Sequence, residues 1–180
     1  MKHLRHLTDD LTHVMHVTHL KHLKTCWVVV IKFGPVMSRD RVRSLLAARL
    51  RAWQARDTEA LAATYAIDAT VTSPIFSTLE GRAAIKQSFD ALFRSFPDWQ
   101  HVIEEAPIVG DDDRVVQLFR ARATHRGDFM GLPGSGKRFE ITGVQIFSVN
   151  AEPLVVSERR IYDFTGLLIQ LGVLRGRLGR

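Results

Sequence analysis

The sequence predicts an α+β domain in which three helices precede an antiparallel meander of strands. Between residues 37 and 97, apolar side chains recur every three or four positions, which is the period of an amphipathic helix. From residue 98 to 163, apolar and polar side chains alternate instead, which is the period of a strand. A curved sheet wrapped around helices leaves a concave apolar pocket, so we look for function there.

Composition restricts the class of protein. The single cysteine, Cys26, allows no internal disulfide, so we expect a cytoplasmic protein held together by its core. The longest apolar run, residues 26 to 31, is far shorter than the ~20 residues of a membrane-spanning helix. We therefore expect no membrane partner.

The net charge of +6 lies at the two ends of the chain. Residues 1–36 hold five basic and two acidic residues, and residues 164–180 add three arginines, which leaves 17 of each sign in residues 37–163. A neutral domain argues against a nucleic-acid surface. Binding of nucleic acid by the basic tails is the remaining alternative of that class.

We predict that residues 1–36 are a poorly ordered, His-rich extension, or that Met37 is the true start. Six of the eight histidines recur here at three-residue spacing, which keeps no helical face. Pairs such as His16 and His19 could bind a metal ion, but no carboxylate or thiol completes a ligand set. The folded domain is predicted to span residues 37–174, followed by a basic tail at 175–180.

The first helix follows Met37 and presents one apolar face, formed by Val42, Leu45, Leu46, Leu50 and Trp53. Asp57 is expected to cap a short second helix whose inner face includes Tyr65. Residues 69–73 have strand character, and apolar spacing predicts a third helix that Pro97 ends.

Four strands are expected next, at residues 101–109, 115–126, 138–149 and 154–162. Alternation places His125 on the apolar face of the second of these strands, and Gln145 with Phe147 on the third. On the last strand, Glu158, Arg160 and Tyr162 share one face. Asp163 is expected to cap a short final helix.

Residues 131–137 match the G-x-x-x-x-G-K pattern of a phosphate-binding loop. Arg138 stands where such a loop needs a Ser or Thr, and a strand pattern rather than a helix follows it. The sequence therefore does not predict a nucleotide site.

The residues that could carry chemistry are His125 and Glu158. Glu158 could remove a proton from a carbon beside a carbonyl, while His125 or Tyr162 donates a hydrogen bond to the developing enolate. Two structural alternatives stay open: His125 as a buried, hydrogen-bonded core histidine, and Glu158 paired with Arg160 without turnover.

Three segments resemble the SnoaL-like polyketide cyclases, many of which are labelled ester cyclases: residues 124–137 (THRGDFMGLPGSGK), 143–146 (GVQI) and 158–172 (ERRIYDFTGLLIQLG). The resemblance covers about residues 40 to 174. It implies the cone-shaped α+β barrel of nuclear transport factor two-like proteins, with three N-terminal helices packed in a curved, mostly antiparallel sheet and a short C-terminal helix. It further implies a homodimer without a metal or organic cofactor, and an aldol ring closure run by acid–base residues.

Within this resemblance His125 matches the family's pocket histidine, and Arg160 stands near the cyclases' catalytic aspartate, a base role that an arginine cannot fill. The combined hypothesis is a cofactor-independent acid–base enzyme of cyclase or isomerase type, acting on a small hydrophobic carbonyl or polyketide-like compound. His125 and Glu158 would handle protons, and the pocket would be shaped by Trp53, Tyr65, Gln145, Arg160 and Tyr162. The alternative is a non-catalytic ligand-binding or dimerisation module.

Overall fold

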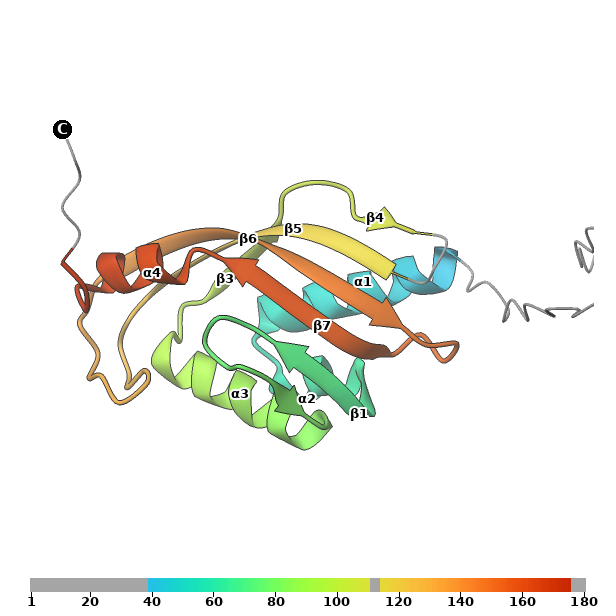
Figure 1. Ribbon diagram of the computed structural model, residues 1–180, viewed down its shortest axis with the longest axis horizontal. Coiled ribbons are helices and arrows are strands. Elements are labelled where there is room, and N and C mark those ends of the chain that lie inside the picture. The colour runs from blue at the N-terminus through green and yellow to red at the C-terminus, as the bar shows by residue number, and fades with distance from the viewer. Residues whose placement is uncertain (1–38, 111–113, 176–180) are drawn as a thin grey trace, which may run out of the picture. The chain divides into compact units, whose positions relative to one another are not determined.

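The computed structural model describes residues 39–110 and 114–175, in which four helices accompany a curved sheet of seven strands (Figure 1). The α+β class and its helix-then-strand order are confirmed. The predictions for residues 1–36 and for the end of the basic tail lie outside the described residues.

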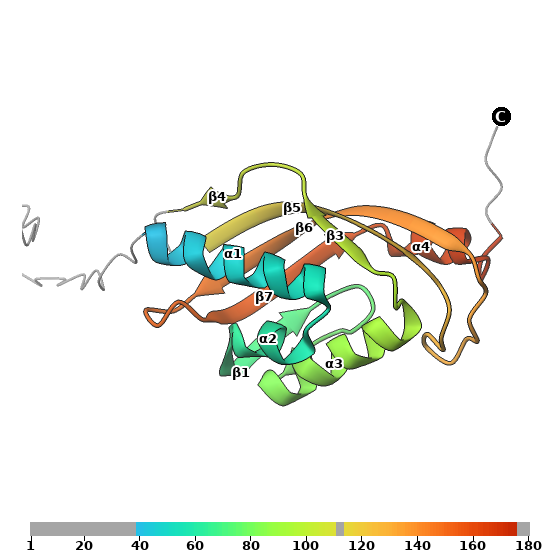
Figure 2. The ribbon, with the colours of Figure 1, turned by 180° about the vertical axis from the view of Figure 1, so that it is seen from behind.

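The helices are α1 (Arg39–Ala55), α2 (Thr58–Ala63), α3 (Arg82–Ser95) and α4 (Phe164–Leu171). Figure 2 shows α1, α2 and α3 on one face of the sheet. Both predicted caps are confirmed: the Asp57 carboxylate accepts a 2.9 Å hydrogen bond from the Ala60 N–H, and Asp163 accepts one of 2.7 Å from the Gly166 N–H.

The strands are β1 (Tyr65–Thr72), β2 (Leu79–Glu80), β3 (Gln100–Ile103), β4 (Ile108–Val109), β5 (Arg114–Thr124), β6 (Arg138–Val149) and β7 (Val155–Tyr162). They are ordered β2-β1-β7-β6-β5-β3, with β4 also paired to β5. Only β1 and β7 run parallel among these described pairs. Since β2 and β3 are edges, the sheet is curved but not closed into a barrel.

Two predicted boundaries were wrong. The strand expected at 101–109 is interrupted between β3 and β4, where Pro107 has no N–H to give to a ladder. Tyr65 begins β1 instead of extending α2, because the preceding carbonyl, that of Thr64, accepts a 2.9 Å hydrogen bond from the Val155 N–H of β7. Pairing with β7 therefore replaces the next helical turn.

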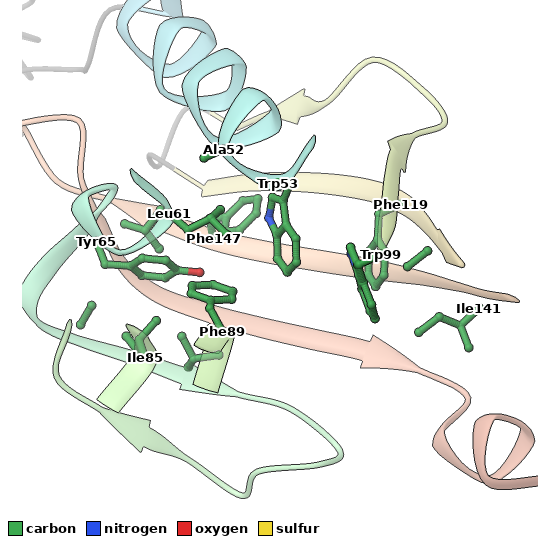
Figure 3. Packing of buried hydrophobic residues seen from close by; sticks show 14 of the residues in the cluster. Ala52, Trp53, Leu61, Tyr65, Ile85, Phe89, Trp99, Phe119, Ile141 and Phe147 are labelled. Carbon is green, nitrogen blue, oxygen red and sulfur yellow. The ribbon is translucent and has the colours of Figure 1, made fainter. Parts of the chain in front are cut away.

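An aromatic core fills the space between the helices and the sheet (Figure 3). Trp53 of α1 meets Phe89 of α3 edge to face, with ring centroids 5.2 Å apart. Phe119 of β5 and Phe147 of β6 belong to the same cluster. The inward alternation predicted for β5 and β6 is thus the pattern that builds the core.

Gly143 sits in β6 where no side chain fits. A Cβ there would lie 2.7 Å from the Ile161 carbonyl oxygen and 2.7 Å from Phe119 Cε1. We expect Gly143→Ala to lower the free energy of unfolding by about 1–3 kcal/mol. Ser148→Ala, on the same strand, should change it by less than about 0.5 kcal/mol. Urea unfolding checks both, and equal midpoints for the two variants would contradict the expectation.

Candidate functional site

A cavity of about 200 Å³ opens between α1, α3 and the sheet. Its walls are mainly aromatic and aliphatic, and include Trp53, Phe89, Leu92, Phe96, Trp99 and Phe119. Figure 3 shows Trp53, Phe89, Trp99 and Phe119 gathered in this region. Of the predicted site residues, the cavity is lined by Trp53, Gln145, Arg160 and Tyr162, but not by Tyr65, His125 or Glu158.

Glu158 lies beneath the cavity, with its carboxylate fully occupied. Oε2 accepts a 3.0 Å bond from Arg49 Nη2 and one from the Tyr65 hydroxyl. Oε1 accepts a 3.0 Å bond from Gln145 Nε2 and a 2.6 Å bond from Arg160 Nε. The Glu158 side chain has no exposed surface, so these four donors replace its water shell.

Arg49 was missed by the sequence analysis, which did not single it out as a site residue. It is buried, donates a 2.8 Å bond to Thr64 Oγ1, and places its guanidinium 4.7 Å from the ring centroids of both Tyr65 and Phe147. The available signal was spacing: Arg49 falls four residues after Leu45 and four before Trp53, which puts it on the apolar face of the helix.

The charges around Glu158 determine its protonation. Burial favours the neutral acid, but the positive charges of Arg160 and Arg49 outweigh burial and hold the pKa of Glu158 at about 2. The carboxylate is therefore ionised at neutral pH and is a weak base.

Arg160 and Tyr162 carry the polarity of this network into the cavity. The Arg160 guanidinium lies 5.3 Å from the Phe89 ring centroid and donates a 3.3 Å bond to the Tyr65 hydroxyl. Burial opposes its charge, but the Glu158 carboxylate raises the pKa of Arg160 above its ordinary value. Burial also raises the pKa of Tyr162 to about 12, although the Arg160 charge and a Ser73 hydrogen bond oppose this shift. The phenol thus stays protonated and can donate a hydrogen bond.

His101 of β3 is a cavity residue that the sequence analysis did not single out. Its ring stacks between Trp53, 4.6 Å away, and Phe119, 5.2 Å away. Both ring nitrogens are buried and have no hydrogen-bond partner among the described residues. Burial, with the charges of Arg160 and Arg49, lowers the pKa of His101 to about 3, so the imidazole is neutral. The inward alternation of Trp99, His101 and Ile103 could have revealed it.

His125 follows β5 and is buried outside the cavity lining. Its Nδ1 accepts a 3.3 Å bond from the Ser135 N–H, and its ring packs 5.5 Å from that of Phe96. Its backbone carbonyl accepts a 2.8 Å bond from the Gly136 N–H, which joins the two ends of the glycine-rich loop. Because residues 128–130 of that loop line the cavity, His125 holds one wall in place.

Within residues 39–110 and 114–175, no three His, Cys, Asp or Glu side chains gather as metal ligands. No helix in that part of the chain is long and apolar enough to cross a membrane.

Glu158→Gln should leave Arg49 and Arg160 buried without a counter-charge, at a cost of about 3–5 kcal/mol in the free energy of unfolding. Because the folded-state pKa of Glu158 lies below its ordinary 4.5, its contribution is present above pH 4.5 and is lost as the pH falls through about 2. The stability difference between native protein and variant should thus be constant above pH 4.5 and shrink below it. Urea unfolding from pH 7 to 2.5 measures this difference.

The control for this series is Glu140→Gln, which removes the same charge from a half-exposed side chain and should cost less than about 1 kcal/mol. Similar losses for Glu140→Gln and Glu158→Gln would show that the buried network does not stabilise the fold.

Comparison with known proteins agrees with this architecture. IdmH from Streptomyces antibioticus, a candidate polyketide cyclase, is 26% identical over 73% of this chain and 98% of its own, with a TM-score of 0.59. AclR from Streptomyces galilaeus, a candidate hydroxylase, is 23% identical over 78% and 87%, with a TM-score of 0.66. A Catenulispora acidiphila protein with a ketosteroid isomerase-like fold, bound to trimethylamine, is 19% identical over 71% and 92%, with a TM-score of 0.60.

No curated protein matches the chain. The family model for SnoaL-like polyketide cyclase matches residues 44–171, which is most of the chain and nearly all of the described domain. The chain therefore belongs to the SnoaL-like polyketide cyclase family.

Proposed function

We propose that this protein is an acid–base enzyme of cyclase type that acts on a small hydrophobic carbonyl compound held in the cavity. Membership of the family supports a cyclase-type function. The observation that carries the proposal is the meeting of a cation, a protonated phenol and a neutral imidazole, those of Arg160, Tyr162 and His101, in a cavity otherwise lined mainly by apolar side chains.

In this mechanism Tyr162 and Arg160 stabilise the negative charge that develops on the substrate oxygen. The Tyr162 hydroxyl donates a hydrogen bond to the carbonyl oxygen, and the fixed Arg160 charge favours the enolate over the ketone. Both act in apolar surroundings, where such interactions are stronger than in water. Glu158 and Tyr65 hold Arg160 in place, so its orientation is set before the substrate binds.

His101 is proposed as the group that receives the proton, because it lines the cavity and its ring nitrogens, unlike the Glu158 carboxylate, have no hydrogen-bond partner among the described residues. A ring nitrogen takes the proton from the carbon beside the carbonyl, and the C–H electron pair delocalises onto oxygen. The enolate then stabilises the imidazolium, which burial and the charges of Arg160 and Arg49 disfavour. In a ring closure, the enolate carbon attacks a second carbonyl of the same molecule, and His101 returns the proton to the new alkoxide.

Glu158 and His125 have positioning roles in this proposal. Both Glu158 oxygens hold donors, including the Nε of Arg160, so Glu158 acts through the orientation of that guanidinium. His125 acts through the glycine-rich loop. That either residue handles a proton directly stays a prediction, which the experiment below tests.

A second candidate function is a non-catalytic small-ligand-binding module of the same fold. The full occupancy of Glu158 favours it, because the one buried carboxylate among the described residues is not free to act as a base.

The test is hydrogen–deuterium exchange at the carbon beside the carbonyl of 2-tetralone, a bicyclic ketone, followed by NMR. Native protein should accelerate exchange, and His101→Phe, which keeps a ring between Trp53 and Phe119, should lose about 10²–10⁴-fold of the acceleration. His125→Phe should lose far less of the acceleration than His101→Phe, as expected for a positioning residue outside the acid–base step.

Exchange that persists in His101→Phe but disappears in folded Glu158→Gln would show that Glu158, and not His101, is the base. Saturable binding of 2-tetralone by the native protein without any acceleration would support the ligand-binding module instead.

We also propose that the protein is a homodimer that pairs through the outer face of the sheet. Register places Leu118, Val144 and Ile161 in one row across β5, β6 and β7, and Ile161 is 51% exposed. Leu118 and Val144 are half-buried, and partly exposed apolar rows of this kind are typical of association surfaces.

For this surface, sedimentation should give twice the 20.4 kDa chain mass. Ile161→Arg should weaken the dimer at least about tenfold, because it buries an unpaired charge. Ile67→Arg, at an exposed β1 position outside the row, should not weaken it. A native monomer, or equal effects of the two variants, would contradict the proposed interface.

A further inference from the structure

The network beneath the cavity carries one more positive charge than negative charge. Arg49 and Arg160 surround the single carboxylate of Glu158, and their side chains are 3% and 12% exposed. Of the described residues that line the cavity, only Asp128 is acidic, and it is exposed. A buried cation without a counter-ion is costly, so the cavity is electrostatically matched to a ligand with one negative charge.

Arg160 is the cation that reaches the cavity. Its Nε donates to Glu158 and its Nη2 to Tyr65, whereas its Nη1 donates to no described residue. Tyr162, two residues further along β7, also lines the cavity with a protonated hydroxyl. A guanidinium N–H and a phenol together can satisfy the two oxygens of a carboxylate.

A second observation points to a ligand independently of charge. His101 Nδ1, His101 Nε2 and Trp99 Nε1 are buried with no partner in the described part of the chain, and both residues line the cavity. Buried polar atoms are nearly always hydrogen-bonded, so three unpaired atoms around one space indicate that a ligand with at least one polar group occupies this space.

Size and wall chemistry restrict the ligand further. The volume of about 200 Å³ exceeds that of an engineered cavity of about 150 Å³ that holds benzene. It therefore has room for one ring or two fused rings. The walls formed by Trp53, Phe89, Trp99 and Phe119 offer the ring contacts that a flat aromatic molecule makes.

We propose that the cavity is a binding site for compact aromatic carboxylates, whose carboxylate lies against Arg160 and Tyr162 and whose rings fill the aromatic cavity. This inference deepens the proposed function, because such an acid would occupy the position of the developing oxyanion and compete with the substrate.

The experiment is calorimetric titration of the full chain at pH 7 with 2-naphthoate and with its neutral isostere 2-naphthamide. A charge-assisted pair with Arg160 should make the carboxylate bind at least about tenfold more tightly than the amide. This comparison uses the native protein alone, so it does not depend on whether a variant folds. Equal affinities, tighter binding of the amide, or no binding of either probe would overturn the proposal.

Two matched variants locate the charge. Arg160→Met should reduce the preference for the carboxylate to within about threefold, because the remaining Arg49 and Glu158 neutralise each other. Arg159→Met removes the same charge from an exposed neighbour on β7 and should leave the preference unchanged. Loss of the preference in Arg159→Met as well would mean that only net charge is sensed, and would contradict the site.

The result of this titration can be distinguished from the result of the exchange experiment that tests the proposed function. Acceleration of 2-tetralone exchange without a preference for 2-naphthoate would leave the enzyme proposal standing and overturn this inference. A preference for 2-naphthoate without exchange would support the site as a binding site alone. If both hold, 2-naphthoate should inhibit exchange competitively.

Discussion

The bond between the Glu158 carboxylate and two arginines is the interaction on which the rest of the structure depends. Arg49 comes from α1 and Arg160 from β7, so one buried anion ties the first helix of the described domain to its last strand. The attraction has to offset the desolvation of three charges, which it can do only because Tyr65 and Gln145 satisfy the remaining lone pairs of Glu158. The fold and the polarity of the cavity therefore share one cause.

This ion pair also divides the polar side chains into two sets: those that hold the site in place and those that face a ligand. Glu158, Arg49 and Tyr65 form a layer that the cavity does not touch, whereas Arg160 belongs to both the layer and the cavity wall. An arginine with one edge fixed by a carboxylate presents its other edge without loss of side-chain entropy. On this basis, functional polarity in the protein resides in Arg160, Tyr162 and His101.

Period and capping made the fold predictable, since α1, α3 and the long strands are each determined by their own apolar alternation. The end of α2 depended on a partner far away in the chain, because pairing with β7 replaces its next turn, whereas the interruption after Ile103 had a local signal in Pro107. For the site, parity placed Glu158, Arg160 and Tyr162 on one face of β7, and the cavity is lined by Arg160 and Tyr162 but not by Glu158. Parity could not show that a buried Arg49 would cover Glu158, because a charge on an amphipathic helix is normally solvated. His101 was missed although its alternation with Trp99 and Ile103 indicates an inward side chain, because a stacked imidazole adds no motif of its own.

The position of β7 has a consequence for how the chain acquires its structure. The last strand lies inside the sheet, between β1 and β6, and it pairs in parallel with the first strand of the sheet. During synthesis the sheet therefore cannot be completed until β7 is made. Until then, the edge of β1 that pairs with β7 is unpaired, and Arg49 lacks the carboxylate of Glu158, which lies 109 residues further along the chain. Such distant pairings slow folding and prolong the exposure of strand edges, so the nascent chain is most prone to aggregate just before β7 leaves the ribosome.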